Sequence, residues 1–329
     1  MATFIQMPTV PYNRMYQRPQ QIMRKLSERG HTVYYMDNIR ENYIIRINKK
    51  LYEIGANYSI DTNRLERPII LWCSHPENVT RIDNLYHDYI IFDIIDDYSY
   101  EFESWNVYLK DMLKAANIIF ATSEELYNKF LTECHKIYMI KNGLDIENFS
   151  PDKKSIPADL PSGKKIVGYV GAVAGWIDWE LIKYISGGNY NIVFIGPKIG
   201  SIDLEFNKNN VYFLGEKKYW QLPFYISNFN CCIIPFKVNK MTNSCDPIKL
   251  YEYMALGKPV VSTAIHEIIK LGNLCYVSRN FTEFIINLNK AINDIDMETA
   301  IARRRFSINN SWDERVDLVI KKLKDDNIL

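Results

Sequence analysis

Residues 246–262 read DPIKLYEYMALGKPVVS, and this stretch contains a helix, a turn and a buried strand in succession. Pro247 suits the first turn of a helix, because its fixed φ is helical and its missing amide is not needed there. Gly257 and Pro259 then end the helix, and the β-branched residues after Pro259 predict a strand that is buried on both faces. A helix that leads directly into such a strand is the repeating unit of a parallel α/β sheet.

The same alternation of strands and helices continues towards both ends of the chain. After residue 164 we expect strands at 165–170, 191–195, 211–214, 230–235 and 259–262, and helices at 178–185, 219–227, 247–255 and 312–324. Before residue 150 we expect strands at 2–7, 32–36, 68–73, 89–94, 118–121 and 137–140, and helices at 18–29, 109–116 and 124–133. Prolines, a glycine and charged residues make 150–164 a linker. The sequence therefore predicts two Rossmann-like domains, residues 1–150 and 151–311.

The charge of the chain is small overall but unevenly distributed. A net charge of +1 gives no field that would hold nucleic acid. Residues 1–50 carry nine Lys or Arg against three acids. This excess fits two interpretations, an ordinary solvated surface or a basic face that meets anionic lipid or a phosphorylated acceptor.

The six cysteines lack any CxxC spacing, which is typical of thiols in a reducing compartment. No apolar run approaches the roughly 20 residues that a membrane span requires, and the first residues do not resemble a signal peptide. We therefore expect a cytoplasmic protein whose membrane contact, if it has any, is peripheral at the inner membrane face.

The start of the 246–262 stretch carries residue types that suit a nucleotide. Free amides near Pro247 and the helix dipole favour an anion, and Lys249 adds a point charge for a phosphate. The two carboxylate oxygens of Glu252 are able to accept both hydroxyls of a ribose. The alternative is a plain helix with charged surface residues, and spacing alone does not separate the two.

Several segments resemble glycosyltransferase family 4 and related enzymes. EYMALGKPVV (252–261) resembles the donor-site signature E-x-x-A-x-G-x-P-V-V of that family. In family order, the other similar segments are RPQQIMRKLSERGHTVYYM (18–36), FDIIDDYSYE (92–101), NGLDIENF (142–149), VGYVGAVAGWIDWELI (167–182) and NVYFLGEKKYWQLPFYISNFNCCIIPF (210–236). They cover nearly the whole chain, and bacterial enzymes of capsule or teichuronic-acid-type polysaccharide synthesis look most similar.

The resemblance implies the GT-B fold, in which two Rossmann-like domains face each other across a cleft. Residues 1–150 would be the acceptor domain, 151–311 the donor domain, and helix 312–329 would cross back to the N-terminal domain. The implied activity moves a sugar from a nucleoside-diphosphate sugar to a surface polysaccharide, glycolipid or glycoprotein, with retention of configuration. The resemblance implies no metal and no cofactor, with the nucleotide sugar as co-substrate.

The resemblance also implies positions for the site. The donor-binding residues would be Gly171, Leu214, Glu216, Asp246, Pro247, Ile248, Lys249 and Glu252. Lys249 would stabilise the leaving diphosphate, and we expect Arg18, His75 and Asp96 to act from the N-terminal domain. Arg18 is unfavourable at a helix start unless it meets an anion, and His75 follows a strand. Asp96 fits either the orientation of acceptor hydroxyls or an ordinary helix cap.

Two departures from the family pattern leave alternatives open. Residues 171–178, GAVAGWID, lack the Arg and Lys with which many members hold the diphosphate, and Ser244 replaces the first Glu of the usual E-x7-E pair. A catalytically silent GT-B partner subunit is therefore an alternative function, and a sugar-nucleotide epimerase of the same fold is another. A nicotinamide dehydrogenase is disfavoured, because no G-x-G-x-x-G follows the first strand of either domain.

Overall fold

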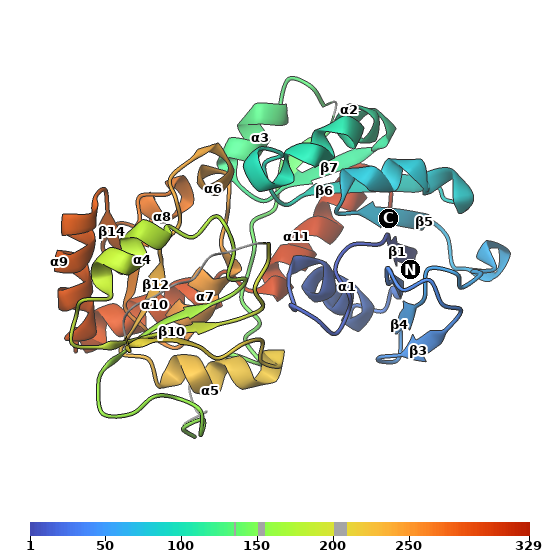
Figure 1. Cartoon of the computed structure of the whole chain (residues 1–329). Coiled ribbons are helices and arrows are strands. Elements are labelled where there is room, and N and C mark those ends of the chain that lie inside the picture. Colours follow the sequence, from blue (N-terminus) through green and yellow to red (C-terminus); the bar gives the residue numbers. More distant parts are fainter. Residues whose placement is uncertain (135, 151–154, 201–208) are drawn as a thin grey trace. The chain divides into compact units, whose positions relative to one another are not determined.

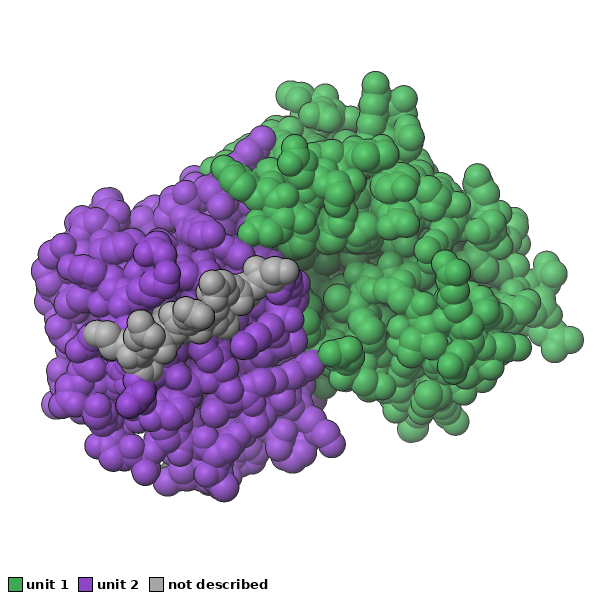
Figure 2. Space-filling view, in the orientation of Figure 1, with its two compact units in different colours: residues 1–142, 312–329 green, residues 143–311 purple. Residues whose placement is uncertain are grey.

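The computed structural model describes residues 1–134, 136–150, 155–200 and 209–329, which form two compact units. Unit 1 consists of Met1–Asn142 with Trp312–Leu329, and unit 2 consists of Gly143–Ser311 (Figure 2). Each unit is built on its own α/β sheet (Figure 1). Residues 151–154 of the predicted linker lie outside the described residues. Within the described part of the chain, no helix has the length and apolar character that crossing a membrane requires.

The sheet of unit 1 has eight strands in the order β3-β4-β2-β1-β5-β6-β7-β8. All neighbours are parallel except β3, which pairs antiparallel with β4 at one edge. The strands are β1 (Thr3–Gln6), β2 (Thr32–Met36), β3 (Ile44–Arg46), β4 (Leu51–Ile54), β5 (Ile69–Cys73), β6 (Tyr89–Ile94), β7 (Ile118–Ala121) and β8 (Ile137–Met139). Every residue of β5 and β7 is buried, as expected for strands covered on both faces.

Four α-helices belong to unit 1: α1 (Arg18–Glu28), α2 (Asn106–Ala115), α3 (Glu124–Phe130) and α11 (Trp312–Asp325). The C-terminal helix α11 therefore returns to the first unit, which confirms the expected crossing back. It packs beside α1 and buries Trp312, Val316, Val319 and Leu323 completely. These apolar residues recur at helical spacing and form one face, which explains why the last residues fold with the first unit.

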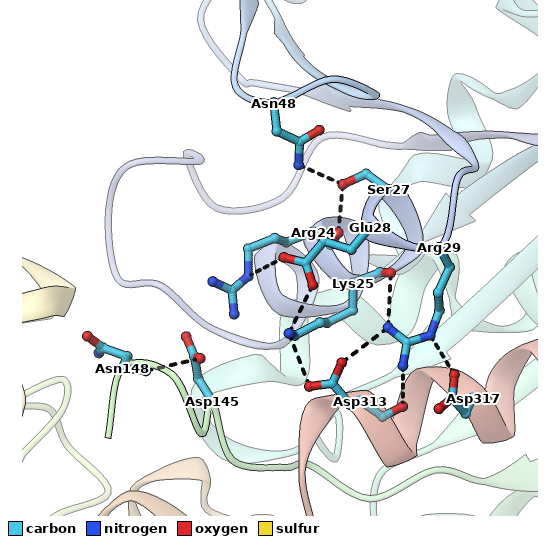
Figure 3. Close-up of polar contacts among 10 residues, drawn as sticks. All are labelled: Arg24, Lys25, Ser27, Glu28, Arg29, Asn48, Asp145, Asn148, Asp313 and Asp317. Atoms are coloured by element: carbon cyan, nitrogen blue, oxygen red, sulfur yellow. Dashed lines mark hydrogen bonds and ion pairs between the residues drawn. The ribbon is translucent and has the colours of Figure 1, made fainter. Parts of the chain in front are cut away.

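Charged side chains border the contact between α1 and α11 (Figure 3). Lys25 Nζ lies 3.0 Å from a carboxylate oxygen of Asp313 and 2.9 Å from one of Glu28. Arg29 pairs with Asp313 and with Asp317. Burial alone would raise the pKa of Asp313, but hydrogen bonds from Lys25 and Arg29 outweigh it and hold the pKa below its ordinary value. Two acids of α11 thus meet two cations, Lys25 in α1 and Arg29 directly after it.

The sheet of unit 2 has six parallel strands in the order β11-β10-β9-β12-β13-β14. They are β9 (Ile166–Val170), β10 (Asn191–Ile195), β11 (Val211–Phe213), β12 (Cys231–Ile234), β13 (Val260–Thr263) and β14 (Tyr276–Ser278). The helices are α4 (Trp179–Ile185), α5 (Leu222–Ser227), α6 (Lys240–Asn243), α7 (Ile248–Ala255), α8 (His266–Ile269), α9 (Phe281–Ile292) and α10 (Met297–Ile308). Cys231 and Cys232 lie in β12 and are fully buried, as small core residues would be.

The structure contains elements that the sequence analysis did not place. Among the strands and α-helices, they are the β3–β4 hairpin in unit 1 and, in unit 2, the elements between β13 and α11 together with the short α6. The expected strands and helices all occur, with ends that differ by a few residues. The confirmed pattern of two parallel α/β sheets places the carboxyl ends of the parallel strands together on one side of each unit. In open sheets, ligands bind at these strand ends.

Candidate functional site

Lys249 and Gly171 meet at the carboxyl edge of the unit 2 sheet. Gly171 follows β9 directly and has φ +134°, a backbone conformation that favours glycine. A Cβ atom built there would lie 2.8 Å from Cε and 3.2 Å from Nζ of Lys249. The absence of a side chain at Gly171 therefore leaves room for the ammonium group of Lys249 beside the end of the strand.

Two aromatic rings flank the same ammonium group. Lys249 Nζ lies 4.9 Å from the ring centroid of Phe236 and 5.3 Å from that of Tyr169. The electron-rich faces of both rings attract a cation at such distances. Tyr169 is itself fixed, because its hydroxyl donates to the carbonyl of Ala172 at 2.9 Å. These contacts position the charge of Lys249 near the start of α7, where an anion is favoured.

Glu252 lies one turn further along α7 and is 5% exposed. Burial raises the pKa of its carboxyl to about 8, although the nearby positive charge of Lys249 opposes this shift. A carboxyl group with so high a pKa is held in an unfavourable setting for its charge, which is common where a ligand completes the environment. Glu252 is thus a buried carboxyl beside Lys249 whose charged form hydrogen bonds from a ligand would stabilise.

Asp145 is a further acid near Glu252, and the sequence analysis did not single it out. It is 2% exposed, and its negative charge contributes to the raised pKa of Glu252. Its carboxylate accepts the backbone N–H of Asn148 at 3.3 Å, a contact drawn in Figure 3. Asp145 lies in the NGLDIENF segment, which the sequence analysis used only as a family landmark. No sequence pattern indicated that Asp145 lies near Glu252, more than 100 positions later.

Asp246 and Pro247 form the entrance to α7. Both oxygens of Asp246 accept the hydroxyl of Tyr251, at 3.0 and 3.1 Å, and the carboxylate is buried. Pro247 is the N-cap residue of α7, which starts at Ile248. Asp246 therefore braces the first turn of the helix that carries Lys249 and Glu252, which gives it a positioning role.

Leu214 and Glu216 lie at the end of β11, two strands away from Gly171 in the sheet. The N–H of Leu214 donates to Phe194 at 2.9 Å, and the N–H of Gly196 donates to Gly215 at 2.9 Å. A Cβ at Gly196 would collide with the carbonyl of Gly171. Residues 171, 196 and 215 thus form a row at the carboxyl ends of three strands, while the side chain of Glu216 is exposed.

The structure corrects the expected role of Arg18. The side chain is fully buried, and its guanidinium forms two hydrogen bonds of 2.8 Å with the two carboxylate oxygens of Asp93. It also donates to the carbonyl of Lys141 and to the side chain of Asn142, both at 3.3 Å. The anion that makes Arg18 tolerable at a helix start is Asp93 of β6, and we no longer assign Arg18 to a ligand.

His75 and Asp96 follow β5 and β6 at the carboxyl edge of the unit 1 sheet. Nδ1 of His75 accepts the N–H of Glu77 at 3.3 Å, so Nε2 carries the proton of the neutral ring. Burial lowers the pKa of His75, and its ring packs against Trp105 with 4.1 Å between centroids. Asp96 is half-buried. The pKa of the Tyr98 hydroxyl is raised mainly by the burial of Tyr98, and the negative charge of Asp96 adds to this shift.

Two comparisons with protein sequences found similarity, one to a family model and one to a single curated relative. Residues 177–294 match the family model described as glycosyl transferases group 1. This segment contains α7 and its Lys249 and Glu252 but not Gly171 or Asp145. The Bacillus subtilis (strain 168) protein TuaH, named for teichuronic acid biosynthesis as a glycosyltransferase, is 25% identical over 156 residues. That match covers 45% of this chain and 39% of the relative's own length.

Solved structures are similar over nearly the whole chain. Sucrose-phosphate synthase from Thermosynechococcus elongatus superposes with a TM-score of 0.73, 13% identity and coverage of 99% of both chains. The trehalose-6-phosphate protein of E. coli, bound with UDP-2-fluoro glucose, gives a TM-score of 0.71 at 9% identity, covering 98% of this chain and 99% of that chain. WaaG, a glycosyltransferase involved in lipopolysaccharide biosynthesis, gives 0.66 at 13% identity, covering 97% and 98%.

These identities establish the fold alone, and the family match concerns residues 177–294 of unit 2. The expected GT-B arrangement of two parallel α/β sheets with a returning C-terminal helix is confirmed. The whole chain has the GT-B fold, and its residues 177–294 match the family model described as glycosyl transferases group 1.

Proposed function

We propose that the chain transfers a sugar from a nucleoside-diphosphate sugar to a glycan or glycolipid acceptor of cell-envelope polysaccharide synthesis. The grouping of Lys249, Gly171 and Glu252 at the carboxyl edge of the unit 2 sheet carries this proposal. The family match of residues 177–294 and the names of TuaH and WaaG support the reaction class and the kind of acceptor.

In the proposed donor complex, Lys249 faces the diphosphate. Its ammonium group lies beside Gly171 and near the start of α7, so one cation and the helix-start amides act on the same anion. The charge that develops on the leaving diphosphate is the main electrostatic demand of the reaction. Lys249 and the amides meet that demand without a metal ion, in line with the retaining, metal-independent reaction implied by the family resemblance.

Glu252 is proposed to accept hydrogen bonds from the two hydroxyls of the ribose. Bound hydroxyls stabilise the carboxylate form, whereas burial favours the protonated form in the unliganded chain. Backbone groups from Leu214 to Glu216 are proposed to read the nucleobase, because they lie at the carboxyl end of β11, in the same row of strand ends as Gly171. Asp246 acts indirectly by bracing the first turn of α7 through Tyr251.

The acceptor is assigned to unit 1, with His75 and Asp96 as its candidate contacts. His75 is neutral near pH 7, since burial lowers its pKa, and its Nε2–H is a hydrogen-bond donor. Asp96 would accept from a sugar hydroxyl. In a retaining transferase of this kind the leaving phosphate can take the acceptor proton, so neither side chain is required as a general base.

A catalytically silent partner subunit is the second candidate, and one observation favours it. Residues 171–178 contain no Arg or Lys, so Lys249 lacks the additional cations with which many relatives hold a diphosphate. Such a subunit would bind the nucleotide but form no product. Product formation by the isolated chain therefore separates the two functions.

The first experiment measures thermal unfolding of the purified chain against UDP, GDP, CDP, dTDP and ADP. A ligand at a hundredfold excess over its Kd stabilises the native state by about 2.7 kcal/mol. We expect one nucleotide to raise Tm and Glu252→Gln to remove that rise. The matched control is Glu180→Gln, whose side chain is 74% exposed on the same unit and which should behave like the wild type.

The sugars of that nucleotide are then tested for transfer to lipid-linked glycan acceptors. Stabilisation without transfer or donor hydrolysis would support the silent subunit. The absence of any shift across the panel would contradict the donor site itself.

A further inference from the structure

The β3–β4 hairpin presents apolar side chains to solvent at the edge of the unit 1 sheet. Within residues 39–50, which we call the exposed hairpin, Ile39, Ile44, Ile45 and Ile47 are 47%, 44%, 49% and 38% exposed. All three residues of β3 are exposed, so neither face of this strand is covered. Four exposed isoleucines within nine residues form a local apolar surface that the fold of the unit does not use.

These isoleucines are held in place by an ordered backbone. Gly55 N donates to Tyr43 at 3.0 Å and Ala56 N donates to Ile39 at 2.8 Å, which fixes the chain that leads into β3. A Cβ at Gly55 would collide with the carbonyl of Glu41. The approach to β3 therefore depends on Gly55, which directly follows β4, and the apolar side chains extend from an ordered backbone.

The turn after β3 is fastened to helix α1. The side chain of Asn48 accepts the N–H groups of Lys50 and Leu51, both at 2.8 Å. Its amide nitrogen donates to Ser27 Oγ of α1, also at 2.8 Å (Figure 3). Arg46 closes the turn by donating to the carbonyls of Asn48 and Lys49. The turn is thus braced from two sides.

The exposed hairpin is also basic. It contains Arg40, Arg46, Lys49 and Lys50 against the single acid Glu41. Lys50 lies 3.5 Å from Glu66, but among the residues that the structure describes none forms an ion pair with Arg40, Arg46 or Lys49. Three cations of the segment that carries the isoleucines therefore lack an ion-pair partner among the described residues.

We propose that the exposed hairpin is a docking surface for an anionic membrane. Apolar side chains that enter the boundary between headgroups and acyl chains, with cations at the headgroup level, are the chemistry by which peripheral proteins bind such surfaces. The long side chains of Arg and Lys keep their charges at the phosphates while the isoleucines are buried.

Charge argues against a second copy of the chain as the occupant. The free edge of β3 could in principle pair with another β3, as edge strands tend to do. Such pairing would bring two net-positive segments together, and like charges placed opposite one another are destabilising. A surface rich in phosphate satisfies both the apolar and the cationic part of the hairpin.

This inference is independent of the proposed transfer reaction, because it concerns binding to lipid in the absence of donor and acceptor. The test is co-sedimentation of the full chain with vesicles of phosphatidylcholine alone and of phosphatidylcholine mixed with phosphatidylglycerol. We expect binding to the anionic vesicles that weakens as salt is added, because exposed charges are screened, and little binding to the neutral ones.

Two variants separate the apolar from the electrostatic contribution. Ile44→Thr/Ile45→Thr keeps the β-branched shape that suits a strand and should weaken binding by about tenfold or more. Arg40→Gln/Lys49→Gln leaves the bracing Arg46 intact and should weaken binding by about fivefold for each charge removed. The matched control is Ile269→Thr/Ile286→Thr, which changes isoleucines of equal exposure, 44% and 49%, in unit 2.

The outcomes either support or overturn the proposal. Binding that is lost in both hairpin variants and kept in the control supports it, provided that all variants keep the wild-type Tm. Wild-type protein that binds neither kind of vesicle overturns it, as does equal loss in the control. Concentration-dependent dimerisation that disappears in Ile44→Thr/Ile45→Thr, without vesicle binding, would assign the surface to a second copy instead.

Discussion

At the scale of single residues, the buried carboxyl of Glu252 makes the stability of unit 2 depend on pH. Its pKa is about 8 in the folded chain against an ordinary value of 4.5. Between these values the folded chain keeps the proton and the unfolded chain releases it. The free energy of unfolding should therefore fall as pH rises through this window, by on the order of 5 kcal/mol, and become constant above it.

Urea denaturation of wild type and Glu252→Gln from about pH 5 to about pH 9 checks this dependence. The variant lacks the titrating group, so the difference between the two proteins should grow with pH and level off near pH 8. The proposed ribose contact adds a second expectation, because hydroxyls bind the carboxylate form. Nucleotide affinity of the wild type should rise over the same window, and a pH-independent affinity would contradict the contact.

Arg18 and Asp93 form a buried ion pair whose loss should be costly. Arg18→Met leaves Asp93 buried without its guanidinium partner, which typically destabilises a protein by about 3–5 kcal/mol. Arg18→Met/Asp93→Asn should recover much of that loss, since Asn still accepts the indole N–H of Trp72, which donates to Asp93 at 3.3 Å. Equilibrium unfolding in urea measures both. A stable Arg18→Met protein with weakened nucleotide binding would restore the ligand role that we have withdrawn.

The sequence analysis could locate the residues of α7 but not the partners that come from elsewhere in the chain. Lys249 and Glu252 lie on one helix, so the sequence places them close together, and the family signature rather than spacing alone made them site candidates. The Arg18–Asp93 pair joins positions 75 residues apart, and Asp145 approaches Glu252 across an even longer separation. Such pairs depend on which strands become neighbours, which no local pattern specifies.

At the scale of elements, α11 packs against unit 1 through an apolar face with a charged border. The apolar face should contribute more to the free energy of unfolding than the charged border. Leu323 is completely buried, and Leu323→Ala should lower the free energy of unfolding by about 2–5 kcal/mol. Asp313 is 44% exposed, so Asp313→Asn should cost only about 0.5–1 kcal/mol even though it pairs with Lys25 and Arg29.

Urea titrations of both variants, repeated at high salt, measure this ranking. Salt should reduce the effect of Asp313→Asn and leave that of Leu323→Ala unchanged, because screening acts on exposed charges. A larger effect for Asp313→Asn would mean that the ion pairs, rather than the apolar face, hold the helix.

Elements with a buried face were predictable, and those without one were not. All residues of β5 are apolar and buried, so its sequence alone was sufficient to predict a buried strand. β3 has no buried face, and its three residues carry no alternation. Helix α10 turns Arg303 and Ser307 inward, where they bond Asp294 and the carbonyl of Tyr251. Its buried side is polar, and an apolar pattern does not reveal it.

At the scale of the whole molecule, the proposed functions are divided between the two units. The residues proposed for the donor, from Gly171 to Glu252, belong to unit 2, and the candidate acceptor contacts and the exposed hairpin belong to unit 1. Each unit has a hydrophobic core of its own. The chain crosses from the first unit to the second near residue 143 and returns at Trp312, so the integrity of unit 1 depends on the last residues of the chain.

Two truncations should therefore have opposite results. Removing Trp312–Leu329 deprives unit 1 of four fully buried side chains, each contributing about 1.5–3 kcal/mol. That total is comparable with the whole free energy of unfolding of a typical domain, so unit 1 of Met1–Ser311 should unfold and become sensitive to protease.

The fragment Gly143–Ser311 keeps its complete sheet and should fold and bind the nucleotide that stabilises the full chain. Limited proteolysis with mass spectrometry, followed by nucleotide titration of the fragment, measures both results. A protease-resistant unit 1 in Met1–Ser311 would show that α11 is dispensable, and a folded Gly143–Ser311 that no longer binds would show that the nucleotide needs residues outside unit 2.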